Sequence, residues 1–336
     1  MTRGRLTRRR VSTVAICAAA LATCAVLSLA FGARAVGFGE IYGGLFKKDG
    51  LSIGEIVVRE RIPRTVFGCI AGAALGMAGA LMQAVTRNPL ADPGILGVNT
   101  GAALAVVSGI AFLGIDTLKQ YLIFALAGAA ASAVFVYAIG SLGRGGATPI
   151  KLALAGAAAS AAMSSLISAV LLPRASQMNA YRFWQSGSIG GATWDAIAAV
   201  APLLTIGAVI AVCSSGQLNA LALGDDVAAG LGVHAGRARL IGAAAGVLLC
   251  GATTAIAGPI GFVGLMIPHA ARLVTGPDLR WILPASAFGG AVILLAADVA
   301  GRLLGRPGEI EAGLVTAFIG APTLIVIVLR SKVRTL

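Results

Sequence analysis

The chain has 336 residues, of which 58% are hydrophobic and only 12% are charged. A soluble domain carries about 25% charged residues, so this composition argues strongly against a water-soluble enzyme and against a nucleic-acid-binding domain. The formal net charge of +13 does not alter that conclusion. Five basic residues stand in the first ten positions and most others flank apolar stretches, as in polytopic membrane proteins.

The N-terminus has a basic segment, residues 1–10, followed by the apolar run 11–31. A secretory signal has a similar order, and Ala33-Arg34-Ala35 resembles a cleavage site, but the apolar region of a signal is only about 7–15 residues long. The run 11–31 is longer and can cross about 30 Å of hydrocarbon as a helix. We therefore predict an uncleaved first span, with residues 1–10 in the cytoplasm.

Apolar windows of about 20 residues, separated by Pro, Gly or charged residues, predict ten membrane-spanning helices. The windows are 11–31, 65–85, 94–115, 121–142, 149–172, 192–213, 240–257, 260–274, 282–304 and 312–329. The eighth is short and has Pro268 near its middle, so we expect a bent or partly re-entrant helix there. The sequence thus predicts one all-α, ten-span domain over 11–330, with residues 331–336 as a cytoplasmic tail.

Ten spans place both termini on the same side of the membrane. A modest excess of Lys and Arg on the side of the N-terminus agrees with a cytoplasmic location for both termini. The basic cluster 59–64 falls on the outer side and contradicts this rule, and docking of an acidic external partner would explain it. Asp298 is the one carboxylate well inside a span, and Arg302 follows one helical turn later, which predicts an i,i+4 ion pair.

Two polar connections on the expected cytoplasmic side attract attention. The first, 83–101, contains Pro89 and Pro93, which forbid a continuous helix and keep Asn88 and Asp92 near the inner mouth of the bundle. A gate-forming loop and a simple helix connection are both compatible with this spacing.

The second connection, 214–239, is longer than a turn requires. Apolar residues alternate there with charged ones as in a short amphipathic surface helix; the apolar set is Leu221, Val227, Leu231 and Val233, and the charged set is Asp225, Asp226 and Arg237. The acidic pair favours docking to a protein partner over lying on the membrane surface.

Catalytic signatures are missing from the sequence. It has no phosphate-binding loop for ATP and no H-E-x-x-H pair, and its two histidines, His234 and His269, are far apart. The five cysteines lie in apolar stretches without a C-x-x-C spacing, so neither a metal site nor a disulfide is expected. We expect no covalent chemistry and no bound cofactor in this chain.

Five segments, in order along the chain, resemble one family: the FecCD-type permeases of bacterial ABC importers for iron–siderophore complexes, haem and cobalamin. The segments are Arg61-Ile-Pro-Arg64, Asn88-Pro-Leu-Ala-Asp-Pro-Gly-Ile-Leu-Gly97, Gly258-Pro-Ile-Gly-Phe-Val-Gly-Leu-Met-Ile-Pro-His-Ala-Ala-Arg272, Asp298-Val-Ala-Gly-Arg302 and Gly320-Ala-Pro322. The resemblance covers roughly residues 55–330, and matches of this length in order are highly specific.

The resemblance implies a bundle like that of a cobalamin-importer permease, in the bacterial cytoplasmic membrane. It also implies several partners: a second permease subunit (a copy or a related chain), two cytosolic ABC ATPase subunits that hold ATP and Mg, an external substrate-binding protein, and a ferric siderophore. The pathway would follow the dimer axis, and ATP binding would switch the permease between outward and inward access.

The resemblance also assigns roles to residues of this sequence. The coupling loop to the ATPases would comprise Leu221, Asp225, Asp226, Leu231, Gly232 and Arg237. Inner-gate positions match Asn88 and Leu90, and a second gate would fall near Thr148, where this sequence departs from the family's pattern. Docking of the binding protein would use Arg61 and Arg302, unless Asp298 occupies Arg302.

Other functions remain possible from the sequence. Cobalamin or haem would suit the same scaffold, because the predicted pathway is lined mostly by small, neutral residues. A secondary transporter driven by an ion gradient would need ionisable residues near mid-membrane and paired broken helices, and only Asp298 and the Pro268 bend hint at these. An intramembrane enzyme would need a nucleophile–base or metal set, which the spans do not supply.

Overall fold

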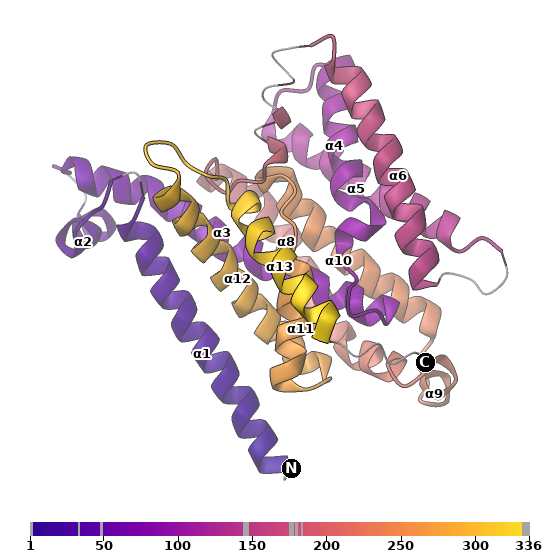
Figure 1. The fold of residues 1–336 in the computed structure, drawn as a ribbon. Coiled ribbons are helices and arrows are strands. Elements are labelled where there is room, and N and C mark those ends of the chain that lie inside the picture. Colours follow the sequence, from indigo (N-terminus) through magenta and orange to yellow (C-terminus); the bar gives the residue numbers. More distant parts are fainter. Residues whose placement is uncertain are drawn as a thin grey trace.

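The computed structural model describes residues 3–32, 34–47, 50–143, 148–174, 178, 181–182 and 184–330, and every regular element in this part of the chain is helical (Figure 1). The longer helices are α1 (Arg3–Ala30), α3 (Ile53–Thr86), α5 (Leu118–Gly140), α6 (Pro149–Leu171), α8 (Trp194–Leu221), α10 (Ala235–Ala257), α12 (Leu279–Leu304) and α13 (Ala312–Arg330). The shorter ones are α2 (Phe38–Phe46), the 3₁₀ turn η1 (Pro93–Leu96), α4 (Val98–Ser108), the π turn η2 (Gly109–Leu113), α9 (Asp225–Gly230) and α11 (Val263–Thr275).

Among the described residues, seven helices are long and apolar enough to cross a membrane. Three shorter apolar helices lie at 98–113, 263–275 and 312–326. Together these segments follow the order of the ten predicted spans, which confirms the all-α prediction. Helix α11 has 13 residues, or about 20 Å of helix, so the eighth segment is as short as the sequence predicts.

Helix α3 forms the centre of the bundle and packs against α12, α10, α11 and α8. Small residues allow this close approach. A Cβ added at Gly79 would lie 1.8 Å from the carbonyl oxygen of Gly264 in α11, and one at Gly76 would lie 2.1 Å from that of Ser286 in α12. Since lipid gives no hydrophobic drive for helix association, backbone contacts of this kind hold the bundle together.

The start of α3 differs from the prediction. The sequence predicts the second span from residue 65, but the helix begins at Ile53, because Ser52 and Glu55 form a capping box. The Ser52 N–H donates to the Glu55 carboxylate at 2.6 Å, and the Glu55 N–H donates to Ser52 Oγ at 3.4 Å. The segment Arg61-Ile-Pro-Arg64 therefore lies within a helix and does not open one.

Two other spans also differ from their predicted bounds. The third, predicted as 94–115, is divided into η1, α4 and η2, and Gly97 at the first junction has φ 68°. The sixth, predicted to end at 213, continues as α8 to Leu221, so the first part of the predicted coupling loop is helical. Helix α2 is not predicted from the sequence. It lies beyond the N-terminal end of α3, on the side of the bundle away from α9 (Figure 1).

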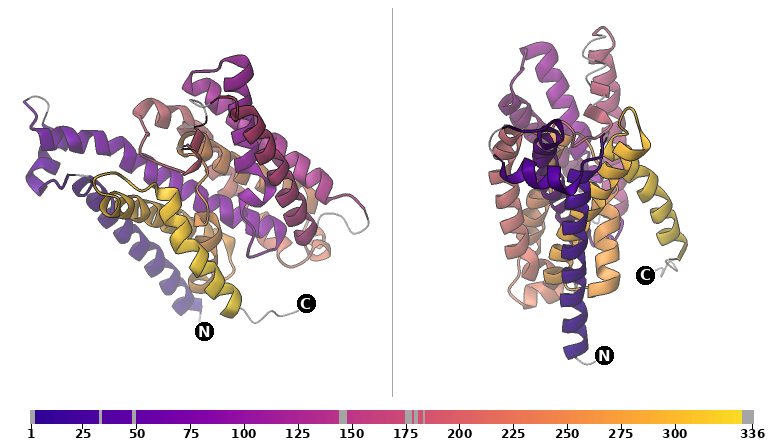
Figure 2. Two further views of the ribbon diagram at one scale, coloured as in Figure 1. Left: turned by 45° about the horizontal axis from the view of Figure 1, so that its top comes forward. Right: turned by 90° about the vertical axis from the view of Figure 1, so that its left-hand side faces the viewer.

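Helix α1 lies at one edge of the bundle (Figure 2). Only 6% of its most apolar 18-residue stretch is buried inside the protein. Its contacts are with α12, α3, α11 and α2. At its N-terminal end, Arg10 Nε donates to the Thr275 carbonyl at 2.9 Å, and the guanidinium group lies over the Trp281 ring at 5.7 Å. Residues 1–2 and 331–336, the ends of the predicted cytoplasmic segments, lie outside the described residues.

Charged side chains gather at the two ends of the bundle, which we name after one residue of each. The Arg10 face comprises Arg10, Arg87, Asp225, Arg239 and Asp278. The Arg64 face comprises Arg61, Arg64, Asp298, Arg302 and Glu309. Helix α1 begins at the Arg10 face and ends at the Arg64 face, where Arg302 donates to its last carbonyls.

Candidate functional site

The loop between α3 and η1 is short and internally hydrogen-bonded. Arg87 ends α3 with φ 52°, in the left-handed region that residues other than glycine rarely adopt. Asn88 Oδ1 then accepts from the Leu90 N–H at 3.0 Å, and Asp92 Oδ1 accepts from the Gly94 N–H at 2.8 Å. Side-chain turns of this kind, together with the two prolines that fix φ, make residues 87–93 a stiff connection. We call it the 87–93 loop.

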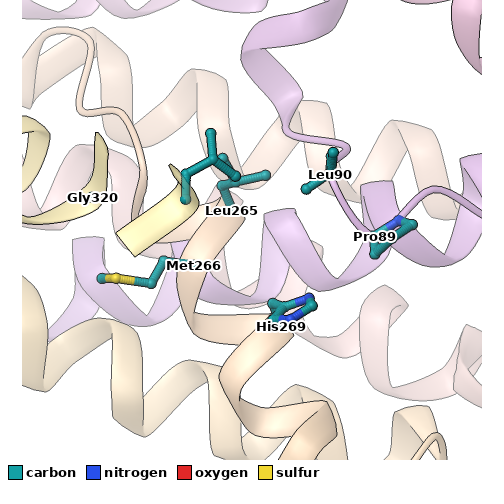
Figure 3. A pocket seen from close by; sticks show the side chains of 7 residues that line it. Pro89, Leu90, Leu265, Met266, His269 and Gly320 are labelled. Carbon is teal, nitrogen blue, oxygen red and sulfur yellow. The ribbon is translucent and has the colours of Figure 1, made fainter. Parts of the chain in front are cut away.

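The tip of the 87–93 loop lies against a small, mostly apolar pocket (Figure 3). The pocket is lined by Pro89 and Leu90 from the loop, by Leu265, Met266 and His269 from α11, and by Gly320 and Leu324 from α13. Leu90 is 38% exposed, so it is only partly covered by these helices. The structure thus places the predicted gate position Leu90 where the loop meets two other helices.

Buried polar groups that sequence reasoning missed lie near this loop. His269 Nδ1 and Gln83 Oε1 are buried and have no hydrogen-bond partner among the described residues. Gln83 Nε2 donates to the Leu265 carbonyl at 3.1 Å. In α4, which follows the loop and η1, Asn99 Oδ1 accepts from the Thr254 hydroxyl at 2.9 Å. Each of these groups is a polar side chain within an apolar segment. That pattern in the sequence indicates a group that needs a buried hydrogen-bond partner.

The predicted coupling loop contains one short helix, α9, and its residues separate into a buried and an exposed set. Leu221 is fully buried at the end of α8, apart from the exposed residues of the loop, and its coupling role stays a prediction. Leu223, Val227 and Leu231, at a spacing of four, are 64%, 49% and 63% exposed. Three apolar side chains left in solvent on a charged surface favour a protein interface.

The other coupling residues lie at the Arg10 face. Asp226 and Arg237 are exposed, and Gly232 turns the chain after α9 with φ 78°, a conformation that glycine adopts without strain. Asp225 pairs with Arg239 at 2.8 Å and also with Arg87. Partial desolvation would raise the Asp225 pKa, but the hydrogen bonds and charges of the two arginines outweigh it and lower the pKa. Asp225 therefore stays ionised at neutral pH.

The second predicted gate position, Thr148, caps a helix. Its hydroxyl accepts from the Lys151 N–H at 3.3 Å at the start of α6. Residues 144–147, which precede it, lie outside the described part of the chain. The structure therefore gives Thr148 a local role and does not bring it to Asn88 or Leu90 through any described hydrogen bond.

At the Arg64 face, the Asp298 carboxylate forms ion pairs with two arginines. Arg302 pairs with it at 2.7 Å, which confirms the predicted i,i+4 pair, and Arg64 pairs with it at 2.7 Å from α3. Arg64 also pairs with Glu309 at 2.8 Å. The network joins α3 to α12 and to the connection that leads into α13.

The two arginines predicted to dock a binding protein are buried. Arg302 is 1% exposed and donates to the carbonyls of Ser28 and Phe31, and Arg61 is 8% exposed and donates to those of Leu29, Ala30 and Arg34. Both satisfy carbonyl groups that the end of α1 leaves without helical partners. In this structure both guanidinium groups are directed to the end of α1, and their docking role stays a prediction.

The bundle of long apolar helices in the described part of the chain, with the charged groups of the Arg10 and Arg64 faces at its two ends, is typical of a polytopic membrane protein. The model of the FecCD transport family matches residues 20–330, so the chain belongs to the FecCD transport family.

Similar proteins cover most of the chain. The ferric enterobactin transport system permease protein FepD of Escherichia coli (strain K12) is 46% identical over 83% of this chain and 83% of its own length. The probable siderophore transport system permease protein YfiZ of Bacillus subtilis (strain 168) is 41% identical over 92% of this chain and 93% of its own. The hemin transport system permease protein HmuU of Yersinia pestis is 35% identical over 81% of this chain and 82% of its own.

A solved structure has the same fold. It is described as an inward-facing conformation of a metal-chelate type ABC transporter, and it superposes with a TM-score of 0.81 at 26% identity. The similarity covers 96% of this chain and 99% of the other. The whole bundle, including the short helices, therefore corresponds to the membrane subunit of that transporter class.

Proposed function

We propose that this chain is the membrane permease subunit of an ABC importer that carries a ferric siderophore across the bacterial cytoplasmic membrane by alternating access. The observation that carries the proposal is the family match, together with relatives named for ferric enterobactin and for siderophore transport. Transport of an intact chelate agrees with a bundle of packed helices, because translocation requires a pathway between helices and does not require a catalytic group.

The proposed partners follow from the two faces. The Arg10 face lies in the cytoplasm with both termini, and its exposed residues Asp226, Val227 and Leu231 dock one of two ABC ATPase subunits, which bind ATP and Mg. The Arg64 face receives an external substrate-binding protein. Arg61 and Arg302 act there indirectly, since they fix the end of α1 beneath that surface.

The proposed inner gate is the 87–93 loop. Asn88 shapes its turn and Leu90 closes against α11 and α13. A second permease subunit, a copy of this chain or a related one, supplies the other half of the pathway. ATP binding changes the relative stability of the two access states, and the permease contributes the two conformations.

Haem is the second candidate substrate, because the hemin permease of Yersinia pestis is 35% identical to this chain. Its scaffold is shared, so the bundle alone does not separate a haem from a siderophore. Uptake assays with both ligands in the same cells distinguish the two.

The test is uptake of radiolabelled ferric siderophore by cells that lack this gene, restored with wild type or with Asp226→Lys plus Leu231→Asp. Deletion should abolish uptake, and only wild type should restore it, because the double variant places opposite charge and a buried carboxylate at the proposed ATPase interface. The variant must reach the membrane in equal amount. Uptake that persists after deletion, in cells without a redundant importer, would contradict the siderophore assignment.

A further inference from the structure

An ion pair links the helix proposed to dock the ATPase with the loop proposed to close the pathway. The Arg87 guanidinium, at the start of the 87–93 loop, pairs with Asp225, the first residue of α9. The two residues are 138 positions apart in the chain. Asp225 is therefore not directed solely toward an external partner; it holds a neighbouring part of its own chain.

Asp225 has a second partner that makes a useful comparison. Arg239, in the first turns of α10, donates to both Asp225 carboxylate oxygens, at 2.8 and 3.0 Å. This contact spans only 14 positions and stays within the connection around α9. One bond of Asp225 is thus local, and the other reaches the loop between α3 and η1.

The loop can transmit a displacement because it is stiff. Arg87 is fixed in the left-handed region, the Ala91 N–H donates to the Asn88 carbonyl at 3.1 Å, and the Asn88 side chain accepts from Leu90. A shift of Arg87 therefore moves Leu90 with it and does not dissipate within the loop. Leu90 is the residue that lies against His269 and the apolar side chains of α11 and α13 (Figure 3).

The pair contributes little to stability, since the side chains of Arg87 and Asp225 are 36% and 47% exposed. An exposed ion pair is weak but directional, and it can break and form again during a transport cycle. A purely structural role would be expected to use a buried pair, such as that of Asp298 with Arg302.

We propose that Arg87 and Asp225 are positioning residues that relay the movement of α9 to the 87–93 loop, so that the ATPase state sets the position of Leu90. The relay rests on the proposed function of α9 and of the loop, and it adds the contact by which one acts on the other. Asp226, Val227 and Leu231 remain the surface that meets the ATPase.

The first experiment measures the loop without transport. Leu90→Cys is introduced into a variant without the five native cysteines, and its rate of modification by a maleimide is followed in the purified full chain. Asp225→Asn and Arg87→Gln should each raise the rate about fivefold, and the double variant no further, because both remove the same contact. Arg239→Gln, which leaves the Arg87 contact intact, should change the rate less than twofold.

The second experiment uses the full complex in proteoliposomes and measures siderophore transported per ATP hydrolysed. Loss of the relay should lower this ratio by roughly five- to tenfold in Asp225→Asn, within the usual range of coupling between sites, while the ATPase still co-purifies with the permease. Co-purification separates the relay from docking: a variant that loses the ATPase would show that Asp225 belongs to the interface, which overturns the proposal.

The two experiments also separate the relay from the proposed function. Unchanged modification rates in all variants would overturn the relay even if the wild-type complex transports siderophore. A wild-type complex that transports no siderophore would contradict the proposed substrate, and the modification rates would still decide whether Asp225 holds the loop.

Discussion

At the scale of single residues, the charges of the Arg64 face act mainly inside the protein. Asp298 lies between Arg64 and Arg302, and its side chain is 1% exposed. Removing one member of such a buried group leaves an uncompensated charge, which costs more than the whole group contributes. The sequence predicted the Asp298–Arg302 pair from spacing alone, but the Arg64 contact joins positions far apart in the chain and depends on how α3 meets α12.

We expect Asp298→Asn to lower the free energy of unfolding by about 3–5 kcal/mol, because it leaves two arginines without their shared carboxylate. Unfolding in detergent, followed by circular dichroism, measures this change. The matched control is Glu309→Gln, which removes the other carboxylate partner of Arg64 at an exposed position and should cost at most about 1 kcal/mol. Equal losses in the two variants would contradict the buried-network interpretation.

At the scale of helices, α3 determines the packing. It contacts its neighbours through backbone surfaces at Gly72, Gly76 and Gly79, where a Cβ has no space. In the sequence Gly68, Gly72 and Gly76 recur every four residues, a spacing that indicates close helix packing but does not say which helix lies opposite. The structure assigns α12 to Gly72 and Gly76, and α11 to Gly79.

Gly79→Ala should separate α3 from α11 and disturb the pocket beside Leu90, since the added methyl group would overlap the Gly264 carbonyl. We expect a loss of about 1–3 kcal/mol in stability and reduced uptake, measured by thermal unfolding and by transport. Gly236→Ala in α10 provides the comparison, because a Cβ there meets no atom within 4 Å. That variant should change stability by less than about 1 kcal/mol.

Helix α9 shows a limit of reading helices from sequence. The alternation of charged and apolar residues predicted a surface helix over 221–237, and a helix is present, but only at Asp225–Gly230. Leu221 belongs to the core because α8 continues to it. No residue near position 213 stops α8, so its true end could not be read from composition.

At the scale of the whole molecule, the two charged faces predict an orientation. If the Arg10 face is cytoplasmic, Cys at position 231 should react with a membrane-impermeant maleimide only in inverted vesicles. Cys at position 309 should react in spheroplasts. Both variants, Leu231→Cys and Glu309→Cys, are made in the cysteine-free chain, since both sites are exposed. Three predicted spans, an odd number, separate positions 231 and 309, so labelling of both sites from one side would contradict the ten predicted membrane crossings.

The class of the protein was available from the sequence. Low charge, long apolar windows and basic flanks require burial in lipid whatever the detailed packing, because hydrocarbon cannot solvate exposed polar groups. The five matching segments then indicated the family, which the comparison with known proteins confirmed. The positions of Asn88 and Leu90 in a loop followed from the two prolines beside them.

The tertiary structure decided which groups face outward and which meet each other. The family resemblance implies a docking role for Arg61 and Arg302, yet both are buried, because they donate to carbonyl groups at the end of α1. The pairing of Arg87 with Asp225 was equally invisible in the sequence. Local pattern determines helix, loop and membrane placement, whereas contacts between distant residues depend on how the helices pack, and one chain's spacing does not contain that information.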